Sequence, residues 1–301
     1  MPGPILKDMN KLPAAERIQI LSMLVEGSSM RSISRVVGVS INTVTKLLVD
    51  AGTACLAYHD RAVRNVKASK VQCDEIWSFN YAKEKNVASA IAAPERAGDV
   101  WTWTAIDSDS RMILSWLVGD RDAGSAVEFL EDLRSRLANR VQLTTDGHSA
   151  YLDAVEAVFS DEIDYAMLVK IYGNPPEGEQ RYSPGECKGT RARVISGSPD
   201  IRHISTSYAE RMNLSIRMGM RRFTRLTSGF SKRIENHCHA LALYFVFYNF
   251  VKAHKTLGGI SPAMAAGVSD RLWEMSDILA LVESGEVPQK RGPYTKQAIS
   301  N

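Results

Sequence analysis

The spacing of apolar positions changes along the chain and divides it into two regions. Over the first fifty residues, apolar side chains recur at helical spacing, which predicts three short helices. From residue 70 onward, apolar and polar residues alternate over segments rich in β-branched and aromatic side chains, which predicts strands. The predicted strands cover residues 71–79, 99–106, 112–118, 141–145 and 165–169. We therefore expect an all-helical N-terminal region followed by a region that contains a sheet.

The segment 30–48 has the spacing of a helix-turn-helix. Its apolar positions would form the core of two crossing helices, Ser34 is small where they meet, and Gly38 suits the turn between them. Ser40 caps the second helix, so the positions just after it lie on the face that enters the major groove in such motifs. The predicted base-contacting residues are Asn42, Thr43 and Lys46. A plain three-helix bundle that does not bind DNA is the alternative.

The order of elements in the second region predicts an α/β fold with a mixed sheet. Three strands come first, and the turn at 107–110 joins the second and third as an antiparallel hairpin. Helices predicted at 123–138 and 149–159 separate the later strands, which favours parallel neighbours flanked by helices. A long helical region is expected from 207 to 255, with a break near Ser228.

The composition is that of an ordinary globular protein and excludes several classes. Of the 301 residues, 45% are hydrophobic and 24% are charged, which excludes disordered and fibrous chains. The longest apolar run, 240–248, is too short for a membrane span. The first residues lack the charged and apolar parts of a secretion signal, and the four cysteines have no CxxC spacing. We therefore expect a reducing, cytoplasmic compartment, without a disulfide framework or a zinc ribbon.

The net charge of +3 conceals an uneven distribution. Residues 1–70 carry ten basic and five acidic side chains, and residues 202–233 carry eight basic side chains and one acid, Glu210. Like charges at this density repel unless an anion neutralises them, which favours phosphate binding over a merely solvated helix face. The predicted phosphate contacts in the second cluster are Arg221, Arg222, Arg225, Lys232 and Arg233.

Three acidic residues occupy positions from which they could act on such a phosphate. Asp74 lies within a predicted strand, Asp146 ends another, and Glu210 lies in the first turn of a helix. Carboxylate oxygens are the ligands that Mg²⁺ prefers, and divalent cations serve the attacking and leaving oxygens of a phosphoryl transfer. Each acid also has a structural explanation: a half-exposed strand position, a turn pair with Gly147, and a capping box with Ser207.

Three segments resemble the acidic motifs of DDE transposases from bacterial insertion sequences, most closely those of the insertion-sequence-one type. They are DEIW at 74–77, TDGHSAY at 145–151 and SYAERMN at 207–213. Further segments that fit the same family are 221–227, 231–237, 248–250, 254–257 and 261–264. The resemblance covers about residues 70–268 and implies a ribonuclease-H-like catalytic domain.

The resemblance implies that Asp74, Asp146 and Glu210 are the catalytic acids and that they hold two Mg²⁺ (or Mn²⁺) ions per site. It also implies that Arg217 contacts DNA, and both Arg217 and Asn213 share a helix face with Glu210. The expected partners are double-stranded transposon ends and target DNA. Because two ends must be brought together, we expect a homodimer or a larger assembly.

Alternatives stay open for the third acid and for the function. Because an insertion lengthens the spacing before Glu210, Glu235 is a weaker rival and Asp107 an outside candidate. The first function predicted is a DNA transposase that binds inverted-repeat ends and catalyses metal-dependent strand cleavage and strand transfer. The alternatives are a non-catalytic helix-turn-helix DNA-binding regulator or inactivated transposase relative, and a structure-selective nuclease of the same fold.

The predicted domain boundaries follow from these elements. Residues 1–52 form the helix-turn-helix DNA-binding domain, and 53–69 form a linker. Residues 70–268 form the ribonuclease-H-like DDE catalytic domain, within which 171–206 is an irregular insertion. Residues 269–301 form a C-terminal helix and a basic tail.

Overall fold

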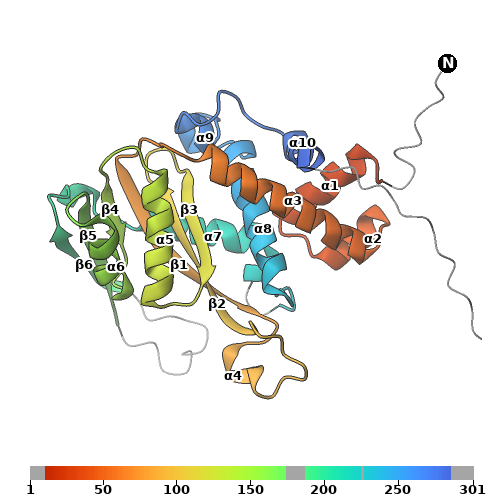
Figure 1. Cartoon of the computed structure of the whole chain (residues 1–301), viewed down its shortest axis with the longest axis horizontal. Coiled ribbons are helices and arrows are strands. Elements are labelled where there is room, and N and C mark those ends of the chain that lie inside the picture. Colours follow the sequence, from red (N-terminus) through yellow and green to blue (C-terminus); the bar gives the residue numbers. More distant parts are fainter. Residues whose placement is uncertain (1–10, 174–186, 225–226, 286–301) are drawn as a thin grey trace, which may run out of the picture.

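The computed structural model describes residues 11–173, 187–224 and 227–285. The N-terminal part is a helical bundle, shown in Figure 1, of α1 (Ala14–Val25), α2 (Met30–Val37) and the start of α3 (Ile41–Ala62). Gly38, between α2 and α3, has a φ of 76°, the left-handed conformation predicted for this turn. Ser40 caps α3, because its hydroxyl accepts a hydrogen bond from the Thr43 backbone N–H at 3.1 Å. The predicted helices and the turn are therefore confirmed.

Helix α3 extends into the segment that was predicted as a linker. The predicted linker 53–69 begins inside this helix, which is 22 residues long. Cys55 and His59 are buried one turn apart, so the segment has a helical period. The period was not recognised in the sequence because its buried positions are small or polar instead of strongly apolar. The buried face packs on α8 (Ile234–Val246), and His59 Nε2 lies 3.3 Å from the carbonyl oxygen of Ile113. The first part of the predicted linker is therefore helix, and it joins the N-terminal bundle directly to the sheet.

Six strands form one mixed sheet in the order β3-β2-β1-β4-β5-β6. Strand β2 pairs antiparallel with β1 and with β3, whereas β1, β4 and β5 run parallel to one another. The strands are β1 (Lys70–Asn80), β2 (Gly98–Asp107), β3 (Ile113–Gly119), β4 (Gln142–Thr145), β5 (Asp164–Tyr172) and β6 (Cys187–Ser196). The predicted hairpin and the parallel later strands are confirmed, and this strand order is the ribonuclease-H-like α/β fold that the motifs implied.

Strand β6 occupies part of the segment that was predicted as an irregular insertion. Residues 187–196 of the predicted insertion 171–206 pair antiparallel with β5 at the edge of the sheet. Most of the β6 side chains are exposed, so neither face carries the apolar alternation by which a half-buried strand is found. That part of the prediction was wrong, and residues 174–186 lie outside the described part of the chain.

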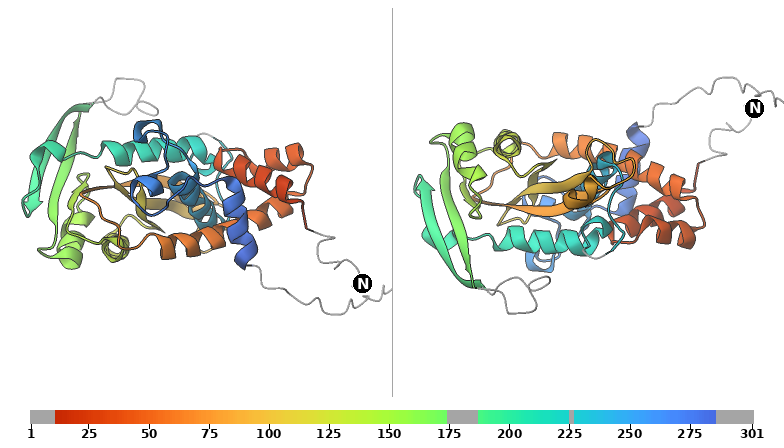
Figure 2. Two further views of the ribbon diagram at one scale, coloured as in Figure 1. Left: turned by 90° about the horizontal axis from the view of Figure 1, so that it is seen from above. Right: turned by 90° about the horizontal axis from the view of Figure 1, so that it is seen from below.

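Helices cover both faces of the sheet (Figure 2). Helices α5 (Ala123–Arg136) and α6 (Ala150–Phe159) pack together on one face, and α7 (Ser207–Gly219) packs on the other face against β1 and β2. The extended backbone of Met220 ends α7 and starts an interruption that reaches α8 and contains the predicted break near Ser228. The remaining helices and 3₁₀ turns are α4 (Glu84–Val87), α9 (Pro262–Ala265), α10 (Met275–Gly285), Ile201–His203, Arg221–Phe223 and Lys255–Leu257.

The turn after α8 covers the edge of the sheet at β3. Phe247–Val251 forms a π-helical turn that follows α8 directly. Within it, the buried Asn249 side chain accepts a hydrogen bond from the Ile113 N–H at 2.9 Å and donates one to the Ile113 carbonyl oxygen at 2.8 Å. These bonds give the edge strand the partners that a further strand would give. The sheet therefore ends at β3, against α8 and α3.

The C-terminal segment predicted from residue 269 contains a helix, α10, which begins at Met275. Helix α10 packs on α1 and α3 of the N-terminal bundle. Residues 286–301, which contain the predicted basic tail, lie outside the described residues. Within the part of the chain that the structure describes, no helix is long and apolar enough to cross a membrane.

Candidate active site

Asp74 and Asp146 lie close together because strand β4 is much shorter than β1. Strand β4 pairs with β1 only over residues 70–72 and ends at Thr145. Asp146 therefore emerges beside the part of β1 that β4 leaves uncovered, where Asp74 is located. The Asp146 Oδ1 accepts a 2.8 Å hydrogen bond from the backbone N–H of His148, which orients its carboxylate.

Helix α7 brings Glu210 and Asn213 to the same part of β1. The backbone N–H of Tyr208, in the first turn of α7, donates to Gln72 Oε1 at 2.8 Å and ties the start of the helix to the strand. About one turn after Glu210, Asn213 Nδ2 donates to Asp74 Oδ2 at 2.8 Å. The shared helix face of Glu210 and Asn213 was predicted, whereas the contact between Asn213 and Asp74 was not.

Glu210 is held by two neighbours. Its Oε1 accepts a 2.5 Å hydrogen bond from Thr206 Oγ1 and lies 2.6 Å from Lys170 Nζ. Lys170 comes from β5, so the ion pair joins α7 to the sheet. The ammonium of Lys170 is therefore the counter-charge of Glu210.

The three predicted acids Asp74, Asp146 and Glu210 line one cavity of about 590 Å³. The other polar residues that line it are Arg121, His148, Ser149, Lys170, Tyr172 and Thr206. The two rival acids do not line this cavity. Glu235 is exposed at the start of α8, and Asp107 is buried at the end of β2. The structure thus brings together the three acids of the motifs and neither rival.

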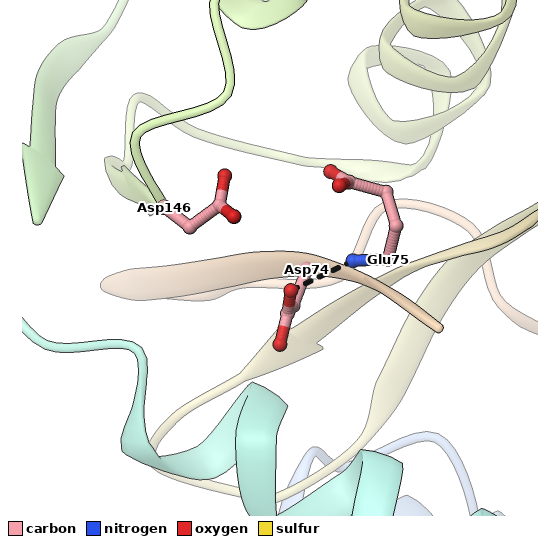
Figure 3. Close-up of side chains that lie close together, drawn as sticks. All are labelled: Asp74, Glu75 and Asp146. Carbon is pink, nitrogen blue, oxygen red and sulfur yellow. Dashed lines mark hydrogen bonds between the residues drawn. The ribbon is translucent and has the colours of Figure 1, made fainter. Parts of the chain in front are cut away.

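Glu75 is a fourth acid at this site, and its place there was not predicted. One carboxylate oxygen from each of Asp74, Glu75 and Asp146 lies within 4.8 Å of the other two. Figure 3 shows Asp74 and Glu75 leaving β1 on opposite sides, with the Glu75 carboxylate facing Asp146. Adjacent residues on a strand point to opposite faces, so sequence alone argues against a shared site for Asp74 and Glu75. Both reach Asp146 because the edge of β1 is open there.

Arg121 lies between Glu75 and Asp146 and was not predicted as a site residue. Its Nε donates to Glu75 Oε2 at 3.2 Å, and its Nη2 lies 3.9 Å from Asp146 Oδ2. The guanidinium also lies over the ring of Trp101, 4.7 Å from the ring centroid. Arg121 therefore offsets part of the negative charge of the acids.

The acids of the site are suited to a divalent cation. Burial and then the charge of Asp146 raise the pKa of Asp74 to about 7, and the same two causes raise the pKa of Glu75 to about 7. Glu75 Oε1 is buried and has no partner of good hydrogen-bond geometry among the described residues, although the Tyr151 hydroxyl is near enough to lower the pKa of Glu75. A cluster of hard oxygen donors that contains an unpartnered buried oxygen fits a cation such as Mg²⁺ or Mn²⁺.

The predicted base-contacting residues lie at the start of α3. Asn42 and Lys46 are exposed, and Lys46 Nζ lies 2.5 Å from Asp50 Oδ2. Thr43 is half-buried, and its hydroxyl lies 2.9 Å from that of Ser40 at the helix cap. Asn42 and Lys46 are therefore accessible to a partner, whereas Thr43 contributes to the cap.

The predicted phosphate contacts differ in exposure. Arg221, Lys232 and Arg233 are exposed in the segment between α7 and α8. Arg217 is half-buried in the last turn of α7. Arg225 lies outside the described residues. Three exposed cations therefore lie in the segment between α7 and α8.

Arg222 differs from its neighbours because its guanidinium packs inward. Its Nε donates to Ser231 Oγ at 2.7 Å, and its Nη2 lies 3.8 Å from the sulfur of Met30 in α2. Burial lowers the pKa of Arg222 to about 10. The prediction that Arg222 contacts a phosphate is at odds with this position, in which it joins the segment after α7 to the N-terminal bundle.

Residues 96–174 match the family model of a DDE domain. The matched segment contains Asp146 and lies between Asp74 and Glu210 in the sequence. It supports the resemblance to DDE transposases that the acidic motifs indicated. No match to the chain was found among curated proteins.

Solved structures similar to this chain include two transposase complexes. With the Mos1 transposase paired-end complex with left transposon end, the identity is 15% and the TM-score 0.22, over 55% of this chain and 61% of that chain. With the piggyBac transposase synaptic complex with hairpin DNA, the identity is 9% and the TM-score 0.37, over 90% of this chain and 70% of that chain. The fold assignment itself rests on the strand order.

Proposed function

We propose that this protein is a DNA transposase that binds the inverted-repeat ends of an insertion sequence and catalyses cation-dependent strand cleavage and strand transfer. The observation that supports this most is the convergence of Asp74, Asp146 and Glu210 on one cavity of a ribonuclease-H-like sheet. These three acids are far apart in the sequence, so only the tertiary fold brings them to one cavity. The match of residues 96–174 to a DDE domain points to the same function.

The side chains of the cavity have complementary roles in this proposal. Asp74, Asp146 and Glu210 would hold divalent cations, which when bound activate the attacking oxygen and stabilise the leaving oxygen of an in-line displacement at phosphorus. The same acids would serve hydrolysis of one phosphodiester, which frees a 3′-hydroxyl, and the attack of that hydroxyl on target DNA. Arg121 and Lys170, which also line the cavity, offer two positive charges to the DNA phosphate.

Two hydrogen bonds would keep the carboxylates in position during both steps. Asn213 Nδ2 donates to Asp74 Oδ2, and the His148 N–H donates to Asp146 Oδ1, each at 2.8 Å. A carboxylate has about four lone-pair positions, so one such bond orients it and leaves others for a cation. Partners of this kind hold metal-binding side chains in the geometry that the chemistry needs.

Substitution of the three acids tests the catalytic part of the proposal. With purified protein, end-containing DNA and Mg²⁺ or Mn²⁺, Asp74→Asn, Asp146→Asn and Glu210→Gln should each lower cleavage and joining by about 1,000-fold or more. The matched control is Glu235→Gln, which changes an exposed acid outside the cavity and should cleave like the wild type. Wild-type rates in all three variants would exclude the assignment, and a wild-type protein that binds without cleaving would favour the regulator.

A separate experiment tests DNA recognition by the start of α3. Asn42→Ala and Lys46→Ala should change which end sequences are preferred, because a lost base contact is worth about 1–3 kcal/mol at its position. Thr53→Ala is the control, since Thr53 is exposed further along the same helix. Competition binding among variant end sequences gives the measurement. An unchanged preference in both variants would remove α3 from the proposal.

The working unit would be a homodimer or larger, because strand transfer requires both element ends in one complex. Sedimentation of the protein with end DNA should give a species with at least two protomers and two ends. A single protomer that joins both ends would contradict this. The place of action would be the bacterial nucleoid, where such DNA is found.

A further inference from the structure

The carboxylate of Glu75 is buried, and one of its two oxygens is left without a hydrogen bond of good geometry. Its side chain is 1% exposed, and its Oε1 has no partner of good hydrogen-bond geometry among the described residues, since the nearby Tyr151 hydroxyl, which acts to lower the pKa of Glu75, also makes no such bond. Its Oε2 accepts one bond, from Arg121 Nε at 3.2 Å. A buried carboxylate oxygen without a donor is unfavourable unless something else satisfies it. The Glu75 oxygen in the acidic cluster therefore carries an unfavourable desolvation free energy that a bound cation would offset.

The unpartnered oxygen belongs to a group with the dimensions of a cation site. One oxygen from each of Asp74, Glu75 and Asp146 lies within 4.8 Å of the other two, and in Figure 3 the carboxylates of Glu75 and Asp146 face each other. Two oxygens on opposite sides of one Mg²⁺ are roughly 4 Å apart, so small side-chain movements bring these three to bonding distance. The three acids can therefore share one ion.

The open edge of β1 explains how an acid from the other face can take part. After Gln72, β4 leaves β1 unpaired on that side until Asn80, which bridges to Ser231, and Asp146 lies in the space where β4 has ended. Asp74 approaches this space from the side of α7, and Glu75 approaches it from the opposite side (Figure 3). In a strand covered on both edges, two consecutive residues would be separated by the backbone of the sheet.

We propose that Glu75 is a ligand of the divalent cation held by Asp74 and Asp146, and that Arg121 balances its charge until a cation is bound. This rests on the proposed function in one respect only, the presence of a cation at Asp74 and Asp146. When ionised, three carboxylates against one guanidinium leave two negative charges, which is the charge that a divalent cation neutralises. Glu75 thus binds from the side of β1 opposite to Glu210.

A structural role for Glu75 makes different predictions. In that case Glu75 would serve only to hold Arg121 over Trp101, or to accept a hydrogen bond from Tyr151, whose buried hydroxyl has no partner among the described residues. Removing the Glu75 charge would then destabilise the protein and leave cation binding intact. A ligand role predicts the reverse, because the buried negative charge is unfavourable until a cation is present.

The test is Mn²⁺ binding to the full-length chain without DNA, measured by electron paramagnetic resonance of the free ion, together with the urea midpoint in EDTA. Glu75→Gln should raise the Kd for Mn²⁺ by about tenfold or more and leave the urea midpoint unchanged or higher. Glu75→Asp, which keeps the charge, should bind with intermediate affinity. Arg121→Gln should tighten Mn²⁺ binding, because it removes the competing cation.

Three controls separate the possible outcomes. Glu162→Gln breaks an ion pair with Arg134 outside the cavity and should leave Mn²⁺ binding unchanged. Tyr151→Phe should also leave it unchanged, and a loss equal to that of Glu75→Gln would show that Glu75 acts through Tyr151, which overturns the inference. Wild-type Mn²⁺ affinity with a lowered urea midpoint in Glu75→Gln would overturn it as well.

Asp74→Asn and Asp146→Asn distinguish a failure of this inference from a failure of the proposed function. If these two variants lose Mn²⁺ while Glu75→Gln retains it, Glu75 is not a ligand and the transposase proposal is unaffected. If none of the three substitutions changes Mn²⁺ binding, the acidic cluster holds no cation and the proposed chemistry fails with the inference. Loss of binding in all three variants is the expected result.

Discussion

Asn213 of α7 donates a 2.8 Å hydrogen bond from its amide to Oδ2 of Asp74 on β1. Glu210 lies about one turn before Asn213, so this bond sets the distance between the helix that carries the third acid and the strand that carries the first. Asp74 is surrounded by other acids, whose repulsion would otherwise turn its side chain away. Asn213 is therefore expected to position Asp74.

Asn213→Ala should lower the rate of end cleavage by about 10- to 100-fold, the usual effect of removing a group that orients a metal-binding side chain. Asn213→Asp should lower it further at neutral pH, because it sets a second carboxylate against Asp74. Single-turnover cleavage at saturating Mg²⁺ gives the measurement. Ser215→Ala is the control on the same helix, since the Ser215 hydroxyl donates only to the Arg211 carbonyl. A wild-type rate in Asn213→Ala would contradict the positioning role.

The neighbouring residues Arg221 and Arg222 should have opposite phenotypes. Arg221 is exposed, so Arg221→Ala should weaken DNA binding for all sequences and reduce the slope of log affinity against log salt by about 1. Arg222 packs on Ser231, so Arg222→Ala should lower the free energy of unfolding and leave the salt slope unchanged. Fluorescence anisotropy over a range of salt concentrations and urea denaturation make the two measurements. Equal salt slopes for both variants would show that the inward position of Arg222 is not kept on DNA.

Helices α3 and α8 pack closely at Gly52. A Cβ at this position would lie 2.4 Å from His239 Cβ and 2.6 Å from the His239 carbonyl oxygen. Alanine normally stabilises a helix by about 1 kcal/mol relative to glycine, but Gly52→Ala should instead lower the free energy of unfolding by about 1–3 kcal/mol, because the two helices must separate.

The matched control for Gly52 is Gly124, in the first turn of α5. A Cβ there would meet only the Asp122 side chain, at 3.6 Å, which is ordinary contact. Gly124→Ala should therefore leave the free energy of unfolding unchanged or raise it by a few tenths of a kcal/mol, up to about 1 kcal/mol. In urea denaturation, we expect the free energy of unfolding to fall in Gly52→Ala and to stay unchanged or rise in Gly124→Ala. A stabilised Gly52→Ala would mean that α3 and α8 are not held this closely.

The parts of the fold that were predicted from the sequence are those that depend on local pattern. Alternation located β1, and β-branched and aromatic runs bounded by turns or helices located β2 to β5. The positions of Gly38 and Ser40 located the turn and the cap before α3. The second half of α3 was missed because Gly52 and His59 become interior positions only when α8 and β3 pack on them. Edge strand β6 has no buried face, so it shows no alternation that could reveal it.

The acids of the motifs were predicted from a family resemblance, and physical pattern alone would not have joined them. Asp74, Asp146 and Glu210 meet only because β4 stops at Thr145 and α7 crosses β1. Glu75 was not predicted for the same reason. It is buried beside Asp146 only because β4 does not pair with β1 beyond Gln72. The signal that could have found it is a glutamate whose neighbours on the same face of the strand, Cys73 and Trp77, are apolar, because a charged side chain there needs a partner.

His59 should make the stability of the protein fall in acid. Burial, and then the nearby charge of Arg136, lower the pKa of His59 from its ordinary value of 6.5 to about 4. Between these two values the unfolded chain binds the proton and the folded chain does not, so the free energy of unfolding decreases as the pH falls. The contribution of this one side chain is about 3 kcal/mol between pH 7 and pH 4.

Comparison of the wild type with His59→Gln isolates this contribution, because glutamine can keep a hydrogen bond to the Ile113 carbonyl but does not titrate. Urea denaturation at pH 7, 6, 5 and 4 should give a shallower loss of stability in the variant. His237, whose pKa burial lowers to about 3, and Asp132, whose carboxylate pairs with Arg136, remain in both proteins and affect both curves alike. Parallel curves for the two proteins would show that His59 is not buried as a neutral side chain, and hence that α3 is not held against β3 in solution.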